Sequence, residues 1–409
     1  MKKRYLLLIP VAVCVLISAA SFGFVQLRPD RAPEQLQPLV LTRDTQNTQE
    51  GSGMDTGSAV LEEQAASPEQ EQAMQLTSAM TLEQKLYQML FVRPEALTGV
   101  EQVTQAGDAT KTALEQMPVG GILYTKNNLT GNGQAENMIR TTQEYAAGAG
   151  AQIPLFVGIE EEGGLVTNAD ALSTTSYDTM YSLNGNTAKA TEIGQTYAKQ
   201  LGALGFNVNF APVADVLNSA DNTMTGGQSF GTDASVVSEM VASEVRGMQQ
   251  NNMMAVLKHF PGYGSVNSGN ETDRTLEEML ASDIKPFEAG IAQNAAFVLV
   301  SNMTDTNLDS VPCCLSSKVM TDLLREQLGY TGIIMTDELD AGGLSEYAAG
   351  NAVVAAVQAG ADVVLCPESV SEAYNALNAA IEEGELSESR IDESVQRILT
   401  AKLTYGVIA

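Results

Sequence analysis

Residues 253–262 read MMAVLKHFPG, a short apolar run that ends in a lysine, a histidine and a Pro-Gly turn. Continuous apolar runs of this length are typical of strands buried on both faces of a parallel sheet. Similar runs recur along the chain: GILY from Gly121, LFVGI from Leu155, VNF from Val208, FVLV from Phe297, IIM from Ile333 and VVL from Val363. The sequence therefore predicts repeated strand–helix units.

The number of these units favours an α/β fold of the (β/α)8 TIM-like barrel type over an open sheet. One connecting segment, AKATEIGQTYAKQLGALG from Ala188, has the apolar spacing of a helix. Its Gly202 and Gly205 suit a helix end and the turn that follows. We expect helices of this kind to cover the outside of the barrel.

Two further segments precede the predicted barrel domain, which spans residues 78–409. Residues 1–27 combine a basic start with a long apolar run, the pattern of an export signal or an uncleaved membrane anchor. Residues 28–77 are rich in Gln, Glu, Ser, Thr and Gly, which predicts a disordered linker. The sequence thus predicts an extracytoplasmic protein, secreted or membrane-anchored at the cell surface, with N-terminal membrane contact.

The predicted domain opens with TLEQKLYQML from Thr81. Thr81 and Gln84 have the spacing of a capping box, which marks a helix start. An apolar face then follows, formed by Leu82, Leu86, Met89 and Leu90. This spacing predicts a helix that continues through Leu90.

Composition excludes several classes of function. The net charge of −28 and the lack of a Lys/Arg cluster argue against nucleic acid as a partner. The chain has 4 cysteines in no C-x-x-C pattern and a single histidine, so a Cys/His zinc site is not expected. No dinucleotide-binding fingerprint follows a predicted strand, and we expect neither a cofactor nor a metal.

Polar and ionisable side chains follow the ends of the predicted strands. They include Glu160, Asp215, Lys258, His259, Asn302 and Asp337. In a barrel, the carboxyl ends of all strands meet at one rim, where active sites are built. The sequence therefore predicts a polar pocket lined by carboxylates.

Carboxylates with one lysine, one histidine and no metal-binding set suit glycoside hydrolysis. That reaction needs a carboxylate to attack or stabilise the anomeric carbon, and a proton donor for the leaving oxygen. Schiff-base chemistry with Lys258 as the nucleophile is the competing barrel chemistry. The spacing of these residues leaves both open.

From about residue 78 onward the chain resembles glycoside hydrolase family 3 in its single-domain form, similar to bacterial β-N-acetylhexosaminidases. The resemblance rests on GGILYTKNN from Gly120, IEEEGGLV from Ile159, NVNFAPVADV from Asn207, SFGTD from Ser229, LKHFPGYG from Leu257, TGIIMTDEL from Thr331 and LSESRIDESVQRILTAKLTYG from Leu386. It implies retaining hydrolysis of a β-linked amino sugar. The implied partner is an amino-sugar oligosaccharide or a muropeptide, as in cell-wall glycan.

The resemblance also implies roles for individual residues. Asp337 lies at the position of the family's nucleophile, and Lys258 and His259 match the pair that binds sugar hydroxyls. The predicted substrate-binding set is completed by Glu160, Asn168, Asp215 and Gln228. Three of these depart from the family pattern: Glu160 replaces an Asp, and Asn168 and Gln228 each replace an Arg, so two bidentate donors are lost.

The family's general acid/base is missing from this sequence. In the family a loop after KHFPG carries an Asp-x-His pair, whereas the loop here reads SVNSGNETDRTLEEM from Ser265. One alignment places Glu271 at the His position and another places Asn270 there, while a further family His becomes Asn302. Glu271 or Asp273 is the tentative acid/base, provided that a desolvated site raises its pKa.

Two hypotheses follow from this mixture of retained and lost residues. The first is a glycosidase with a shifted acid/base, in which two carboxyls flank the glycosidic bond. The second is a catalytically impaired, hydrolase-like barrel that binds cell-wall glycan or a protein partner. The loss of the acid and the arginines favours the second hypothesis, and the presence of Asp337, Lys258 and His259 favours the first.

Overall fold

The computed structural model describes residues 66–219, 222, 225–266, 270–341, 344, 347 and 349–408. Its central sheet has 8 parallel strands in the order β10-β1-β2-β3-β4-β5-β7-β9. The strands are β1 (Leu90–Val92), β2 (Gly121–Tyr124), β3 (Phe156–Ile159), β4 (Val208–Asn209), β5 (Met254–Phe260), β7 (Phe297–Val300), β9 (Ile333–Thr336) and β10 (Val364–Leu365). A parallel bridge between Met335 and Val363 joins β9 to β10, so the sheet nearly closes into a barrel.

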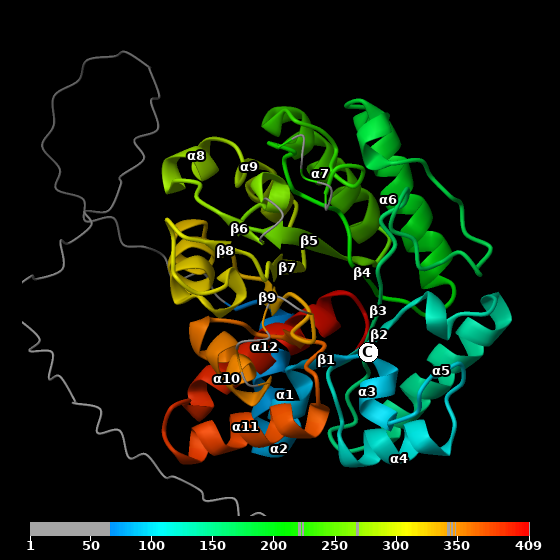
Figure 1. Ribbon diagram of the computed structural model, residues 1–409. Coiled ribbons are helices and arrows are strands. Elements are labelled where there is room, and N and C mark those ends of the chain that lie inside the picture. The colour runs from blue at the N-terminus through cyan, green and yellow to red at the C-terminus, as the bar shows by residue number, and fades with distance from the viewer. Residues whose placement is uncertain are drawn as a thin grey trace, which may run out of the picture. The chain divides into compact units, whose positions relative to one another are not determined.

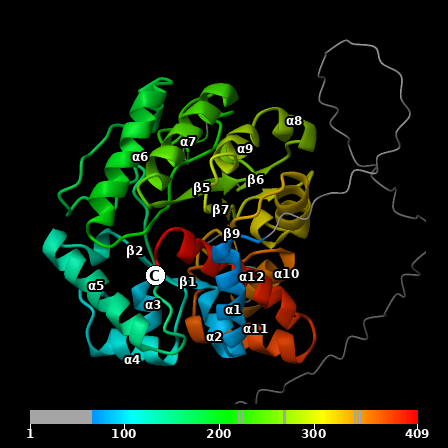
Figure 2. The same cartoon turned by 180° about the vertical axis from the view of Figure 1, so that it is seen from behind.

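Helices surround this barrel on its outside (Figure 1, Figure 2). They are α1 (Pro68–Ala79), α2 (Leu82–Gln88), α3 (Pro94–Thr98), α4 (Asp108–Gln116), α5 (Asn132–Gly148), α6 (Thr187–Gly202), α7 (Ala234–Gln249), α8 (Leu276–Ala281), α9 (Lys285–Ile291), the π-helix η5 (Lys318–Gln327), α10 (Ala349–Ala359), α11 (Val370–Glu382) and α12 (Glu388–Thr404). A separate pair of short parallel strands, β6 (Glu271–Thr272) and β8 (Thr304–Asp305), lies outside the barrel sheet. The predicted alternation of strands and helices in an α/β barrel is confirmed.

The first strand was not predicted from the sequence. The capping box is present, since Thr81 and Gln84 exchange hydrogen bonds of 3.0 and 3.2 Å. The helix ends at Gln88, however, and Leu90 begins β1 instead of extending the helix. A short, fully buried apolar run has the same pattern in a strand as in the last turn of a buried helix, so periodicity cannot separate the two.

The predicted linker also needs correction at its C-terminal end. Residues 68–77 belong to α1, which begins with a capping box between Ser67 and Gln70 and packs against α12 through a face that includes buried Ala73. Residues 1–65, which include the predicted signal or anchor, lie outside the described residues. Among the described residues, no helix is long and apolar enough to cross a bilayer.

A cluster of phenylalanines packs between the strands of the barrel. Phe91 on β1 stacks on Phe156 on β3 at 6.3 Å between ring centroids and meets Phe210 edge-on at 5.5 Å. A Cβ at Gly158 would lie 2.8 Å from both Phe91 and Phe210, so only glycine fits there. Each buried ring contributes about 2–3 kcal/mol of transfer free energy, which makes this cluster a main source of barrel stability.

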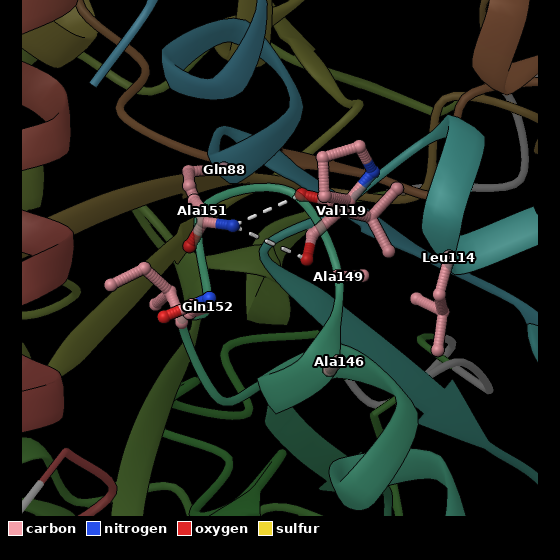
Figure 3. Close-up of a pocket in the computed structure, with 9 residues that line it drawn as sticks. Gln88, Leu114, Val119, Ala146, Ala149, Ala151 and Gln152 are labelled. Atoms are coloured by element: carbon pink, nitrogen blue, oxygen red, sulfur yellow. Dashed lines mark hydrogen bonds between the residues drawn. The ribbon is translucent and has the colours of Figure 1, made fainter.

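The N-terminal ends of β1 and β2 are tied to the last helix by a buried lysine. Lys402 on α12 is 0% exposed, and its Nζ donates to Gln88 Oε1 at 2.9 Å and to the Gly120 carbonyl at 3.0 Å. Gln88 Nε2 donates in turn to the carbonyls of Pro118 and Val119 (Figure 3). Burial lowers the pKa of Lys402 to about 7, so this amine loses its charge near neutral pH.

Candidate active site

The predicted site residues come from the opposite, C-terminal ends of the strands. Glu160 directly follows β3, His259 lies near the end of β5, and Asp337 directly follows β9. This arrangement follows from the parallel sheet, in which every strand ends at the same rim. Most of these side chains form two ion-paired groups, one around Lys258 and one around His259. A third group surrounds Asp337.

Lys258 is the centre of the first group. Its ammonium is 2% exposed and lies 2.6 Å from Glu160 Oε1 and 2.5 Å from Glu162 Oε1. Gln228 Nε2 donates to Glu162 Oε2 at 2.8 Å. Gln228 therefore contacts the site through Glu162, a residue that the sequence analysis did not assign.

The charge state of Lys258 argues against Schiff-base chemistry. Burial disfavours the charged amine, but its attraction to Glu160 and Glu162 outweighs this and raises the pKa of Lys258. Burial likewise opposes ionisation of Glu160, but the attraction of its carboxylate to the Lys258 ammonium is stronger and lowers the pKa of Glu160. A Schiff-base lysine attacks as a neutral amine, so this doubly paired ammonium suits a hydrogen-bond donor to a ligand rather than a nucleophile.

His259 forms the second group with Asp215. Asp215 is 0% exposed, and its Oδ2 lies 2.9 Å from His259 Nδ1. Asp215 Oδ1 accepts from the backbone N–H groups of His259 and Tyr263 at 3.2 and 2.7 Å, which fixes the carboxylate. Burial opposes the charged ring, but Asp215 outweighs it and raises the pKa of His259. The pairing leaves Nε2 as the ring nitrogen available to a ligand.

Asp337 is half-buried and held by the main chain. Its Oδ1 accepts from the Glu338 N–H at 2.9 Å, and its Oδ2 accepts from the Asn302 N–H at 3.3 Å. The Asp337 N–H donates to the Val300 carbonyl at 2.9 Å, which anchors the residue to β7. Backbone donors orient the carboxylate without neutralising it, as a nucleophile requires.

A chain of hydrogen bonds fixes the loops around Asp337. Asn302 Nδ2 donates to the Glu338 carbonyl at 2.8 Å, and the Cys314 thiol donates to Asn302 Oδ1 at 2.9 Å. Asn270 Nδ2 donates to the Asn302 carbonyl at 3.0 Å, and the Tyr263 hydroxyl donates to Asn270 Oδ1. Among the described residues of this loop, Asn270 is therefore one whose side chain reaches the strand ends.

Glu271 and Asp273, the tentative acid/base residues, are not brought to this group. Both side chains are exposed, and Glu271 lies in β6, opposite Thr304 of β8. Within the described parts of the chain, no hydrogen bond or ion pair joins either carboxylate to Asp337, Lys258 or His259. Their proposed role in proton transfer stays a prediction.

Comparison with known proteins identifies the family to which this arrangement belongs. A family model described as "Glycosyl hydrolase family 3 N terminal domain" matches residues 81–401. The chain belongs to glycosyl hydrolase family 3. The matched range contains the barrel strands and every predicted site residue, and only α1 of the named elements precedes it.

Several relatives of this family 3 chain have names or known structures. It is 28% identical over 322 residues to beta-hexosaminidase A of Pseudoalteromonas piscicida, covering 71% of this chain and 54% of the relative. It is 30% identical over 284 residues to beta-hexosaminidase LpqI of Mycobacterium tuberculosis, covering 63% of this chain and 70% of the relative. The chain thus spans about half the length of the Pseudoalteromonas protein.

Two solved structures share the fold. A family 3 beta-N-acetylglucosaminidase from a Paenibacillus species superposes with a TM-score of 0.75 at 32% identity, covering 81% of this chain and 64% of that one. A beta-N-acetylhexosaminidase from Beutenbergia cavernae superposes with a TM-score of 0.70 at 27% identity, covering 79% of this chain and 98% of that one.

Asn168, a predicted substrate-binding residue of the family 3 chain, is engaged by the main chain. Its Oδ1 accepts from the Lys126 N–H at 3.0 Å, and its Nδ2 donates to the Glu160 carbonyl at 2.8 Å. Its own N–H donates to Glu161 Oε2 at 2.8 Å. Asn168 therefore links the loops after β2 and β3 and forms part of the wall of the site.

Arg93 is a site residue that the sequence analysis missed. It directly follows β1, and its guanidinium pairs with Glu338 at 2.6 Å and with Asp340. It thereby joins the end of β1 to the loop that carries Asp337. The signal is present in the sequence, because LFVR repeats the pattern of an apolar run that ends in a charged residue, but the helix predicted through Leu90 takes in the first residue of this run.

Proposed function

We propose that this family 3 chain is a retaining glycoside hydrolase of the β-N-acetylhexosaminidase type, with Asp337 as its nucleophile. The observation that carries the proposal is the placement of Asp337 at the end of β9. There two backbone N–H groups orient its carboxylate, at the same rim of the barrel that carries Lys258 and His259. The names of the relatives support an amino sugar as the substrate.

In the first step, an Asp337 oxygen forms a bond to the anomeric carbon while the bond from that carbon to the leaving oxygen breaks. The leaving oxygen takes the electron pair of the broken bond. In the second step, water attacks the anomeric carbon, the bond from that carbon to Asp337 breaks, and the proton that the water loses passes to solvent. Two successive inversions restore the original stereochemistry. Lys258 and His259 supply N–H donors to the sugar hydroxyls, because each is held in place by a buried carboxylate.

The leaving oxygen also needs a proton, and among the described residues no titratable side chain hydrogen-bonds to the Asp337 carboxylate, which accepts only from main-chain N–H groups. General acid catalysis typically contributes about two to four orders of magnitude in rate. We therefore propose that the enzyme is fast only with leaving groups that depart without protonation. Glu271 or Asp273 would have to move to serve as the donor.

A second candidate function is a carbohydrate-binding barrel that does not cleave. The observation that favours it is the contrast between the fixed Lys258 and His259 groups and the exposed Glu271 and Asp273. Such a protein would bind amino-sugar glycan and turn over no substrate.

The test compares two β-N-acetylglucosaminides, one with a dinitrophenyl and one with a methyl leaving group. The proposal predicts hydrolysis of the dinitrophenyl glycoside, loss of that activity in Asp337→Asn, and a rate at least a hundredfold lower with the methyl glycoside. Asp322→Asn, a change of an exposed aspartate on η5, serves as the matched control and is expected to keep full activity. Glycan binding without hydrolysis of either glycoside would leave the binding function.

We also propose that the protein acts outside the cytoplasm, on the support of the basic and apolar pattern in residues 1–27. Cell fractionation tests this by comparing the full chain with a variant that lacks those residues. Retention of both in the cytoplasm would refute export.

A further inference from the structure

Glu244 on α7 carries a buried carboxyl group that the proposed reaction does not use. It is 1% exposed, and among the residues that the structure describes neither of its oxygens has a hydrogen-bond or ion-pair partner. A polar group that is buried without a partner costs folding free energy, and native proteins contain few such groups. Glu244 therefore calls for a role other than packing.

Close packing of α6 and α7 holds Glu244 in the interior (Figure 1). A Cβ at Gly194 on α6 would lie 2.4 Å from the Glu244 carbonyl oxygen, and a Cβ at Gly247 on α7 would lie 2.4 Å from the Thr191 carbonyl oxygen. Both distances are shorter than van der Waals contact, so a larger residue at either position would push the helices apart. The backbone of Glu244 is therefore fixed against α6.

The loop after β3 is tied to the same helix. Asn209 on β4 accepts from the Glu161 N–H at 2.9 Å and donates to the Glu161 carbonyl at 2.8 Å. Its Nδ2 also lies 3.7 Å from the sulfur of Met248, which is one turn beyond Glu244 on α7. Asn209 thus connects the loop that carries Glu162 to the part of α7 that carries Glu244.

Tyr197 on α6 lies next to the same loop. A Cβ at Gly163, the residue after Glu162, would lie 2.9 Å from the Tyr197 hydroxyl oxygen. Burial, together with the neighbouring Glu161 and Glu244, raises the pKa of Tyr197, so its hydroxyl keeps its proton. Tyr197 therefore borders Glu244 as a neutral group.

The positive charge of Lys258 is already shared by two carboxylates. Its ammonium lies 2.6 Å from Glu160 and 2.5 Å from Glu162. Burial and repulsion by Glu162 raise the pKa of Glu244 to about 8, so Glu244 is neutral near pH 7. As the pH rises through that value, Glu244 becomes a second negative charge that acts on Glu162.

Glu162 is the charged group that responds to Glu244. Besides α6, the elements α9 and β5 pack against α7. The buried or half-buried ionisable groups on the neighbouring elements are Lys189 and Tyr197 on α6, Lys258 and His259 on β5, and Glu160, Glu161 and Glu162 directly after β3, whereas Lys285 and Glu288 on α9 are exposed. Within the described chain, only Glu162 and the neutral Tyr197 interact electrostatically with Glu244. Repulsion from an ionised Glu244 therefore falls on Glu162.

We propose that Glu244 is a positioning residue, which acts through Glu162 on Lys258 and thereby sets the affinity of the site for its sugar ring. The inference rests on the proposed function, in which Lys258 donates to sugar hydroxyls. While Glu244 is neutral, Glu162 holds the ammonium in place. Once Glu244 is ionised, repulsion displaces the Glu162 carboxylate. Lys258 then loses one of the two partners that orient it, and the sugar binds less tightly.

Calorimetry tests this with N-acetylglucosamine and the full chain carrying Asp337→Asn, at pH 6.5 and 9.5. At pH 6.5 the additional change Glu244→Gln should leave the affinity unchanged, because both side chains are neutral. At pH 9.5 this variant should bind about fivefold more tightly than its parent, a factor that corresponds to one hydrogen bond. Glu239→Gln, which removes an exposed carboxylate from the same helix, is the control and should match the parent at both pH values. His259 is present in every protein compared, so its titration does not alter the comparison.

Urea unfolding of the parent and of Glu244→Gln gives a second readout. The unfolded chain releases the Glu244 proton near pH 4.5, whereas the folded chain keeps it up to about pH 8. The stability of the parent relative to the variant should therefore fall as the pH rises between these values. This fall combined with equal affinities at pH 9.5 would make Glu244 a structural residue and overturn the positioning role.

The positioning role would also be overturned if Glu239→Gln behaved like Glu244→Gln, or if none of the proteins bound the sugar. Hydrolysis of the dinitrophenyl N-acetylglucosaminide by the wild type is assayed separately. Hydrolysis with equal affinities at pH 9.5 would remove the positioning role alone. The predicted difference in affinity without hydrolysis would keep the positioning role and remove the hydrolase.

Discussion

Asp337 depends on its neighbours for orientation, and Asn302 is the side chain that connects most of them. Asn302 donates to the Glu338 carbonyl and accepts from the Cys314 thiol, while its own N–H contacts Asp337. In the proposed reaction Asn302 would act as a positioning residue, through the loop that carries Asp337.

Asn302→Ala should lower kcat about fivefold and change KM little, since the lost hydrogen bond is worth roughly 1 kcal/mol and affects the placement of Asp337. Cys314→Ser is the matched control, because a serine hydroxyl can also donate to Asn302 Oδ1. Steady-state kinetics on a dinitrophenyl glycoside checks both. Equal losses in the two variants, or a change confined to KM, would refute the positioning role.

His259 gives the site a dependence of stability on pH. Its pKa in the folded protein is raised above the ordinary value of 6.5 by Asp215, against the opposing effect of burial. The ion pair therefore contributes its full stability below about pH 6.5, and loses it as the pH rises through the raised pKa.

Chemical denaturation of the wild type and of His259→Gln between pH 5 and 9 measures this contribution as a difference in the free energy of unfolding. The difference should be largest at the acidic end and should shrink as the pH rises. A difference that is constant, or that grows with pH, would show that Asp215 does not stabilise a charged His259.

At the scale of residues, the sequence placed Asp337, Lys258 and His259 at the correct rim because each directly ends an apolar run. Arg93 was missed because the short strand before it was not recognised, and Glu162 because three adjacent glutamates give no sign of which is buried. The contacts of Asn302 with Cys314 and Glu338 join segments that are distant in the sequence, so only the folded chain reveals them.

Among the elements, α1 is the one whose role differs most from the sequence-based expectation. It lies before the family-matched range of residues 81–401, within a segment that reads as linker. Its packing against α12 indicates that it belongs to the barrel domain. Low hydrophobicity concealed the helix, because its buried positions are small residues such as Ala73.

Ala73→Lys should destabilise the protein by about 2–3 kcal/mol, since a buried charge would separate α1 from α12. Met74→Lys is the matched control, because Met74 is 41% exposed and the change should cost less than about 0.5 kcal/mol. Thermal or urea unfolding measures both variants. Similar stabilities in the two variants would mean that α1 is not docked.

The longer apolar runs, such as those of β2, β3, β7 and β9, were predicted well because each fills a fully buried strand. The pair formed by β6 and β8 has no such signal. Glu271 in β6 is exposed and polar, and only its pairing with Thr304 reveals the strand.

At the scale of the whole molecule, the two ends of the barrel carry different groups of polar side chains. The carboxyl ends of the strands carry Asp337, Lys258 and His259, while the opposite end is closed by Lys402 from the last helix. Lys402 has acceptors for two N–H bonds and no described carboxylate partner, an arrangement that suits a neutral amine. Its buried position links global stability to pH.

The pKa of Lys402 is lowered by burial from 10.5 to about 7. The unfolded chain therefore binds more protons at this residue between those two values, and stability should rise with pH by about 1 kcal/mol per unit in that window. Urea unfolding of the wild type and of Lys402→Met from pH 7 to 10 isolates the effect. The stability of the wild type relative to the variant should rise with pH across this window, and a relative stability that falls with pH would contradict the account.

The most direct test of the central claim asks whether Asp337 is a working nucleophile, as we propose. The protein is incubated with 2-deoxy-2-fluoro glycosides that carry dinitrophenyl leaving groups, and its intact mass is then measured. Such leaving groups depart without a proton, so labelling depends on the nucleophile alone. We predict a mass gain of one fluorosugar in the wild type and none in Asp337→Asn. An unlabelled wild type that nevertheless binds the glycan would contradict the hydrolase and establish a binding protein.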